Sequence, residues 1–288
     1  MTLSELAEEF TITYMENRLR PSTIRGYKIN LQKHTLPYLG DKTIDSLTVD
    51  DLDNLTATLK RKNLSGKSMV YVHATLRKML GYAIKRGYIT KNLYAMFDLP
   101  KVEKYAYQVL DDDQMAKMLE VCIGTDLEIP ITFALCYGLR RGECLGIIPE
   151  RDLNARSRVL HIQRTRSSEH GKEVVTPCKT DKSNRQILLS PEHTERLQKL
   201  QNGSEYACKL SPHHLDKRFK RFLEENDFPR IRFHDLRHTY ATFMLDKGVN
   251  PKIVSSVLGH STVSITLDIY SHANVRMQSV CLQALKGL

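Results

Sequence analysis

The sequence predicts a mainly α-helical protein with a small antiparallel β-sheet, divided into two domains. Apolar residues in the first hundred positions recur at helical spacing, and alternating strand-like segments occur only between about residues 158 and 190. A charged segment that contains a proline, 98–109, interrupts the helical pattern. Because 288 residues can form two separate cores, we expect a helical domain at 1–97, a linker at 98–109 and a second domain at 110–288.

The first domain is predicted to be a bundle of helices with short turns. Ser22 can cap a helix that Pro37 and Gly40 end, and Thr48 is expected to cap the next helix, with Asp51 at its third position. A third helix, which Gly87 stops, carries one apolar stripe. The stripe consists of Met69, Val72, Leu76, Met79, Leu80 and Ala83.

The second domain is predicted to be helical around one small antiparallel sheet. Asp111 and Asp112 are candidate N-caps, and helical sequence continues to about residue 146. Helices are expected to return from about Ser211 to the end. The strand segments are "RVLHIQRTR" at 158–166, "KEVVTP" at 172–177 and "RQILLS" at 185–190.

The composition favours a folded protein with a polyanionic partner. Lys and Arg number 43 against 33 Asp and Glu, and this net charge of +10 suits DNA or RNA, although a solvated basic surface is the simpler alternative. The six cysteines form no C-x-x-C pair, which indicates a reducing, cytoplasmic protein without disulfides. We find neither a signal peptide nor an apolar run long enough to cross a membrane.

The segment "FHDLRHT" at 233–239 allows two interpretations. His234 and His238 are four residues apart, as in the H-E-x-x-H zinc helix, and His260 could be a distant third ligand. However, Asp235 stands where that motif needs a glutamate, and the cation Arg237 lies within the same turn. We therefore expect no metal site.

Further motifs surround this segment in the chain: "GLRRGECLG", "CKTDKSNRQILL" and "LGHSTVSITLDIYSH". Each alone is typical of a surface salt bridge, a solvated turn or a helix end. Together they resemble the active-site signature of the tyrosine recombinases, the phage-type integrases. The matching positions are Arg140, Lys179, His234, Arg237, His260 and Tyr270.

The resemblance covers almost all of the second domain, and "STIRGYKINLQKHTLPYLG" extends it to the first. It implies a helical core-binding domain followed by a mixed α/β catalytic domain.

The chemistry of these side chains supports the resemblance. Transesterification of a phosphodiester adds charge to the non-bridging oxygens, and the two guanidinium groups of Arg140 and Arg237 can each donate paired hydrogen bonds to them. Tyr270 offers a nucleophilic phenol whose free pKa is about 10, so it must lose its proton in the site, with His234 or His260 as an acceptor.

Further roles follow from the resemblance. Lys179, in a turn between strands, would protonate the leaving 5′ oxygen. Tyr270 would form a 3′-phosphotyrosyl intermediate that retains the bond energy, so no metal, ATP or other cofactor is implied. Glu143 is expected to orient Arg140, while His238 and Thr239 are expected to fix the helix.

The resemblance implies double-stranded recombination sites as the partner, bound by a cyclic homotetramer on two DNA sites. The two domains would close around the duplex, and accessory DNA-bending or directionality factors are possible partners. The tail at about 272–288 carries Val275, Val280, Leu282 and Leu285, which can pack on their own domain or, as we favour, insert into a neighbouring protomer. We expect no additional arm-binding domain, because residues 1–20 are too few to form one.

We expect an integrase of a phage or mobile element in the bacterial cytoplasm. An Xer-like chromosome-dimer resolvase or a DNA invertase would use the same chemistry. A non-catalytic DNA-binding protein is the remaining alternative.

Overall fold

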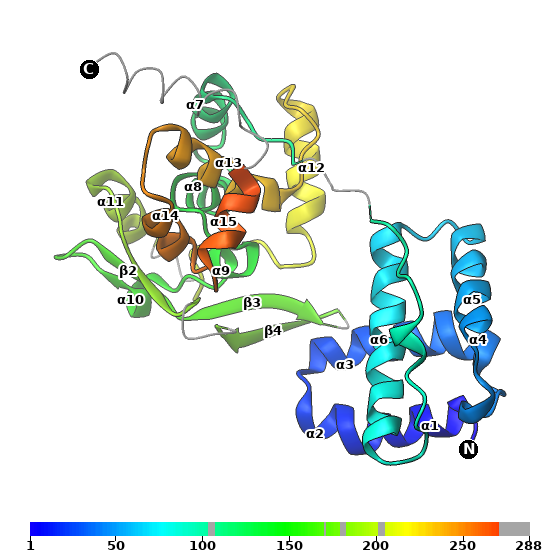
Figure 1. The fold of residues 1–288 in the computed structure, drawn as a ribbon. Coiled ribbons are helices and arrows are strands. Elements are labelled where there is room, and N and C mark those ends of the chain that lie inside the picture. Colours follow the sequence, from blue (N-terminus) through cyan, green and yellow to red (C-terminus); the bar gives the residue numbers. More distant parts are fainter. Residues whose placement is uncertain (103–106, 170, 179–182, 201–204, 271–288) are drawn as a thin grey trace, which may run out of the picture. The chain divides into compact units, whose positions relative to one another are not determined.

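The structure is a computed structural model that describes most of the chain. The described ranges are 1–102, 107–169, 171–178, 183–200 and 205–270, with the side chains of 169 and 268–270 excepted. Two compact units form, Met1–Tyr105 and Ala106–Leu288. Figure 1 shows that helices dominate both units. The five strands that the structure describes all belong to the second unit.

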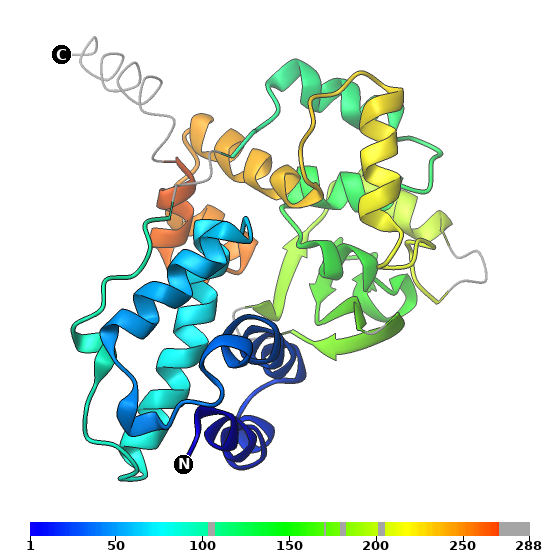
Figure 2. The ribbon, with the colours of Figure 1, turned by 90° about the vertical axis from the view of Figure 1, so that its right-hand side faces the viewer.

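The described elements of the N-terminal unit are all helices, and an isolated antiparallel bridge joins Thr2 to Thr43. Its long helices α5 and α6 lie side by side (Figures 1 and 2). The elements are α1 (Leu3–Glu9), η1 (Phe10–Met15), α2 (Glu16–Arg18), α3 (Pro21–Ile29), η2 (Asn30–Thr35), α4 (Leu36–Leu39), η3 (Ile44–Ser46), α5 (Val49–Arg61), α6 (Gly66–Lys85) and η4 (Leu93–Ala95).

Two predicted helix starts in this unit have different outcomes. The cap at Thr48 is confirmed, because its Oγ1 accepts from the Asp51 backbone N–H at 3.3 Å while the Asp51 carboxylate accepts from Thr48 N–H at 3.0 Å. The cap at Ser22 is wrong: α3 begins at Pro21, after Arg20. A proline fits the first helical position because it has no N–H to leave unpaired there and its φ is already helical.

The apolar stripe predicted for α6 forms the centre of the N-terminal core. All six stripe residues are buried, and the chain leaves the helix at Gly87 with a φ of 76°. His73 is buried on the same helix, where its ring nitrogens contact Thr56 Oγ1 at 2.9 Å and Tyr94 Oη at 3.0 Å.

The C-terminal unit contains nine described α-helices and five described strands. The helices are α7 (Asp112–Val121), α8 (Glu128–Tyr137), α9 (Arg141–Leu145), α10 (Pro149–Asp152), α11 (Pro191–Lys199), α12 (Leu215–Glu225), α13 (Phe233–Asp246), α14 (Pro251–Leu258) and α15 (Val263–Tyr270). Asp111 caps α7 as predicted. Helix α11 was not predicted, although Ser190 caps it and Pro191 opens it.

The strands form two small sheets where the sequence predicted one. Strands β1 (Leu153–Asn154), β2 (Val159–Ile162) and β5 (Arg185–Leu188) make an antiparallel sheet in the order β1-β2-β5. Strands β3 (Arg164–Glu169) and β4 (Lys172–Pro177) make a separate hairpin. The predicted strand 158–166 divides at Gln163, so its first part pairs with β5 and its second with β4.

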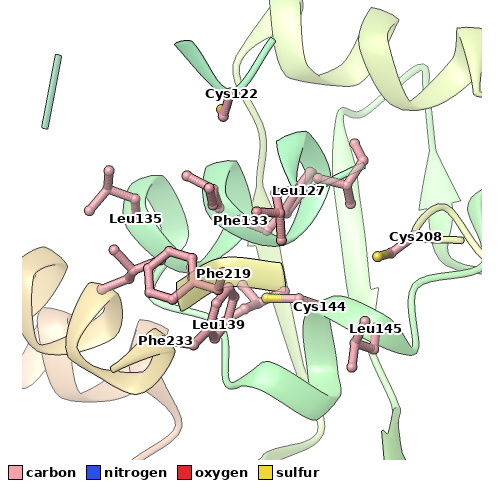
Figure 3. Close-up of a cluster of buried hydrophobic side chains, with 14 of the residues drawn as sticks. Cys122, Leu127, Phe133, Leu135, Leu139, Cys144, Leu145, Cys208, Phe219 and Phe233 are labelled. Atoms are coloured by element: carbon pink, nitrogen blue, oxygen red, sulfur yellow. The ribbon is translucent and has the colours of Figure 1, made fainter. Parts of the chain in front are cut away.

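The core of this unit is formed largely by side chains of α8, α9, α12 and α13. Figure 3 shows Phe133, Leu139, Cys144, Phe219 and Phe233 gathered from these elements and the turn after α8, all at most 3% exposed. The described cysteines are free thiols, and Cys281 lies outside the described residues. Among the described helices, none is long and apolar enough to cross a membrane.

Candidate active site

Arg237 is held between the C-terminal ends of two helices. It lies on α13 with only 2% of its surface exposed. Its Nη1 donates to the Gly138 carbonyl oxygen at 2.6 Å and its Nη2 to that of Leu258 at 2.8 Å. Gly138 follows α8 and Leu258 ends α14, where carbonyl groups lack partners within the helix. Two glycines end these helices. Gly138 and Gly259 have φ values of 64° and 66°, in the left-handed region that glycine adopts readily, and they turn the chain where the two carbonyl groups are exposed to Arg237.

Arg140 lies between α8 and α9 and is the N-cap residue of α9. Its Nη1 donates to Glu143 Oε1 at 2.8 Å, and its backbone N–H donates to Glu143 Oε2 at 2.9 Å. Its Nη2 reaches the Gly259 carbonyl oxygen at 2.8 Å. The Arg140 side chain is 34% exposed, while Glu143 is buried. The expected contact between Glu143 and Arg140 is therefore present, and it leaves part of the guanidinium open to solvent.

A third arginine, which we did not predict for the site, completes this group. Arg185, at the start of β5, donates to both oxygens of Glu143, at 3.1 and 3.0 Å, and through Nε to the Val257 carbonyl oxygen at 2.5 Å. The sequence carries one signal for it, a charged residue at the start of the mainly apolar strand segment "RQILL".

His260 comes directly after Gly259, the cap of α14, and is close enough to Arg237 and Arg140 to feel their positive charges. Its Nδ1 contacts the hydroxyl of the buried Thr266 at 2.8 Å. Burial, followed by the positive charges of Arg237 and Arg140, lowers the pKa of His260 to about 3. The imidazole is therefore neutral at pH 7 in the free protein, and an anion that offsets the two arginine charges would raise its basicity.

His234 and His238 both lie on α13, where His234 is affected by the charge of Arg237 and His238 packs against an aromatic ring. Loss of hydration and then the charge of Arg237 lower the pKa of His234. The centroid of the His238 ring lies 4.1 Å from that of the Tyr107 ring and 4.9 Å from that of the His234 ring. The Thr239 hydroxyl donates to the Asp235 carbonyl oxygen at 2.9 Å, which agrees with its expected role in fixing the helix.

The structure brings Arg140, His234, Arg237 and His260 into one electrostatically coupled group. Lys179 lies outside the described residues. Tyr270 ends α15, which packs against α13 and α14, and only its backbone is described. The roles predicted for Lys179 and Tyr270 remain predictions.

The group suits an anion better than a metal ion. Burial and then Arg140 lower the pKa of Arg237 to about 9, which leaves it charged at pH 7. Within the described residues, Arg237 has no carboxylate partner, so two neutral carbonyl groups hold a buried positive charge. No three His, Cys, Asp or Glu side chains in the described ranges gather as metal ligands would.

Comparisons with known proteins agree with this geometry. A family model described as "Phage integrase family" matches residues 108–277, and "Phage integrase, N-terminal SAM-like domain" matches residues 2–59. Tyrosine recombinase XerC of Alcanivorax borkumensis is 30% identical over 284 residues, which cover 94% of this chain and 90% of that protein. The transposase from transposon Tn916 of Enterococcus faecalis is 25% identical, with 95% and 74% covered.

A solved structure shares the fold over nearly the whole chain. The Tn1549 transposon integrase in complex with transposon right end DNA superposes with a TM-score of 0.84 at 21% identity, covering 99% of this chain and 100% of that one. The predicted fold class, mainly helical with a small antiparallel β component, is thus confirmed, although its strands are divided between two sheets. The chain belongs to the phage integrase family of tyrosine recombinases and is a site-specific DNA recombinase.

Proposed function

We propose that this protein integrates and excises a mobile element by breaking and rejoining DNA strands, with Tyr270 as its nucleophile. The observation that carries the proposal is the pair Arg140 and Arg237. Both guanidinium groups are held by protein acceptors and keep N–H donors that have no partner among the described residues. A guanidinium has five N–H donors, and each of these two groups uses two of them within the described protein. Three donors remain on each for a phosphate.

The arginines stabilise the charge that develops on the phosphate. Because their acceptors hold them in place before DNA binds, little reorganisation is needed when the transition state forms. Carbonyl acceptors orient Arg237 without neutralising it. The same arrangement would bind the scissile phosphate and polarise it for attack.

The reaction needs one proton acceptor and one proton donor. As the Tyr270 oxygen forms its bond to phosphorus, His260 takes the phenol proton, with His234 as the alternative acceptor. The negative charge of the bound phosphate offsets the arginine charges that lower the pKa of both imidazoles in the free protein. The bond from phosphorus to the 5′ oxygen breaks, and Lys179 protonates that oxygen. The 5′-hydroxyl of the partner strand then attacks the phosphotyrosyl link and releases Tyr270. One P–O bond forms for each that breaks, so the sequence of steps needs no ATP.

We assign the two domains complementary roles on DNA. Residues 1–97 grip the duplex through basic helices, mainly at phosphates, and 110–288 carry the chemistry, with 98–109 as the linker. Four copies act together on two DNA sites in the bacterial cytoplasm. The integrase and transposase relatives favour a mobile element, while the XerC relative keeps a chromosome-dimer resolvase as the second candidate.

The decisive experiment uses nicked duplexes that cover the ends of the element encoding this chain. We incubate them with protein in EDTA and separate the products on a denaturing gel. A covalent protein–DNA band is expected from the wild type and from Tyr206→Phe, whose ring lies under Arg166 in a contact that needs no hydroxyl. Tyr270→Phe should bind the same DNA and give no band. A covalent band from Tyr270→Phe would refute the assigned nucleophile.

The tail is tested separately, by removing residues 275–288. If the tail inserts into a neighbouring protomer, the truncated protein should still bind one site as a monomer but fail to pair two sites in analytical ultracentrifugation. Intact pairing and strand exchange would show that the tail has no such role.

A further inference from the structure

Three successive backbone carbonyl groups at the end of α14 each accept a hydrogen bond from a different arginine. The pairs are Arg185 Nε to Val257 O at 2.5 Å, Arg237 Nη2 to Leu258 O at 2.8 Å, and Arg140 Nη2 to Gly259 O at 2.8 Å. Two of these arginines belong to the predicted site. The third, Arg185, has no part in the chemistry proposed above.

The position of these carbonyl groups explains why they attract cations. The last carbonyl groups of a helix have no intrahelical partner and carry the negative end of the helix dipole. The cap at Gly259 turns the chain, with His260 N–H donating back to Ser255 O at 3.0 Å. The turn presents the three carbonyl groups to separate donors.

Arg185 also holds the carboxylate that orients Arg140. It binds both oxygens of Glu143, and both side chains are almost fully buried, at 7% and 1% exposure. Although burial opposes ionisation, the hydrogen bonds from Arg185, followed by its charge, hold the pKa of Glu143 below its usual range. Glu143 therefore stays charged with two guanidinium partners, Arg185 and Arg140.

A count of donors separates the two arginines that share Glu143. Arg185 makes four hydrogen bonds with its five N–H groups: two to Glu143, one to Val257 O and one to Ser183 O at 3.2 Å. Arg140 uses two side-chain donors and is 34% exposed. Arg185 thus has one side-chain donor left where Arg140 has three, which makes it less suited to contact DNA itself.

We propose that Arg185 is a positioning residue for strand cleavage, which acts by fixing both supports of Arg140. One support is Glu143, and the other is the carbonyl run that ends at Gly259. Arg185 is bonded to each support, so its loss releases both at once. This inference rests on the proposed strand-cleavage function.

The test is a double-mutant cycle on the nicked duplex, measured in single turnover at saturating protein. Arg185→Lys keeps the charge but removes the two-pronged contact. It should slow covalent-product formation about tenfold or more, the loss expected for one charge-assisted hydrogen bond, while DNA affinity changes less than about twofold. In an Arg140→Lys background the same substitution should have less than about a twofold effect, because the group it positions is gone.

Arg166→Lys is the matched control. Arg166 is also buried, binds Glu173 with two nitrogens at 2.9 and 2.7 Å, and donates to the carbonyl oxygens of Cys208 and Leu210. It makes the same kinds of contact with no bond to Arg140 or Glu143. Its replacement should lower the melting temperature and leave the cleavage rate of the folded protein unchanged.

The outcomes distinguish the possible explanations. Equal slowing by Arg185→Lys in both backgrounds, wild-type cleavage by Arg185→Lys, or equal slowing by Arg166→Lys would overturn the positioning role. If Arg185→Lys does not fold, Arg185→Gln keeps a donor for Glu143 and takes its place in the cycle. If the wild type itself forms no covalent product on DNA that it binds, the proposed function fails, whereas this inference fails only when the wild type cleaves.

Discussion

Replacing Gly138 by alanine tests whether the two helix ends around Arg237 are as close as the structure requires. Gly138 has a φ of 64°, and a Cβ added there would overlap Leu258 Cδ2 and lie 2.6 Å from Tyr240 Cδ1. The carbonyl oxygens of Gly138 and Leu258 are the two acceptors of Arg237. Gly138→Ala therefore disturbs the backbone, the packing and the position of Arg237 together.

The expected loss of stability has two parts. An L-residue in the left-handed region costs about 1–2 kcal/mol. Crowding in a packed interior adds about 1–3 kcal/mol, because Leu258 and Tyr240 must move. The free energy of unfolding should therefore fall by about 2–5 kcal/mol. A displacement of about 1 Å in a group that binds the reacting phosphate can slow catalysis about a hundredfold.

Gly248→Ala isolates the backbone contribution in the same unit. Gly248 follows α13 with a φ of 80°, and an added Cβ there would meet no atom within 4 Å. We expect this variant to lose only the 1–2 kcal/mol backbone term in urea unfolding and to cleave the nicked duplex at the wild-type rate. If Gly138→Ala matches Gly248→Ala in both stability and cleavage, the close packing inferred around Arg237 is wrong.

Three further predictions address pH, proton transfer and helix capping. Burial lowers the pKa of His73 to about 4, so the unfolded chain binds more protons than the folded one between about pH 6.5 and 4. Stability in urea should fall as pH falls through this window, and an equal slope in His73→Gln would contradict the assignment. Thr266→Val removes the hydroxyl that contacts His260 Nδ1 and should slow single-turnover cleavage several-fold without weakening DNA binding, whereas an unchanged rate would exclude any role for that contact. Thr48→Ala removes the cap of α5 and should lower the unfolding free energy by about 1 kcal/mol, with no loss expected if the helix start is held by packing alone.

The sequence predicts best where a local signal decides the structure. Thr48 and Asp111 cap helices because their side chains satisfy N–H groups three residues away, and the stripe on α6 follows from helical periodicity alone. Helix α11 escaped prediction although Ser190 and Pro191 form a start signal, because its nine residues, "PEHTERLQK", contain little apolar periodicity. The division of the strands at Gln163 depends on pairing partners far along the chain, which no local pattern specifies.

The residues of the site also fall into those that a local motif predicts and those that it does not. Motifs identify Arg140, Arg237 and His260 because these side chains and their spacing are distinctive. Arg185 was missed because its partners, Glu143 and Val257, are 42 and 72 positions away in the chain. Carbonyl acceptors are not visible in a sequence at all, since every residue carries one. Their use can be read only when the fold shows which helix ends meet.

The distribution of acceptors explains how the site keeps its positive charge. Arg140, Arg185 and Arg237 contribute three positive charges, and Glu143 is the carboxylate that pairs with them among the described residues, so the group retains a charge of about +2. Had a carboxylate held each arginine, the site would be fixed but nearly neutral, and a phosphate would gain little by entering it. Carbonyl groups at the ends of α8 and α14 fix the same arginines through dipoles and leave the charge for the substrate. The carboxylate is placed where it reaches the covered Arg185 and one edge of Arg140 and makes no contact with Arg237, so the most buried cation of the group has the least compensation before DNA binds.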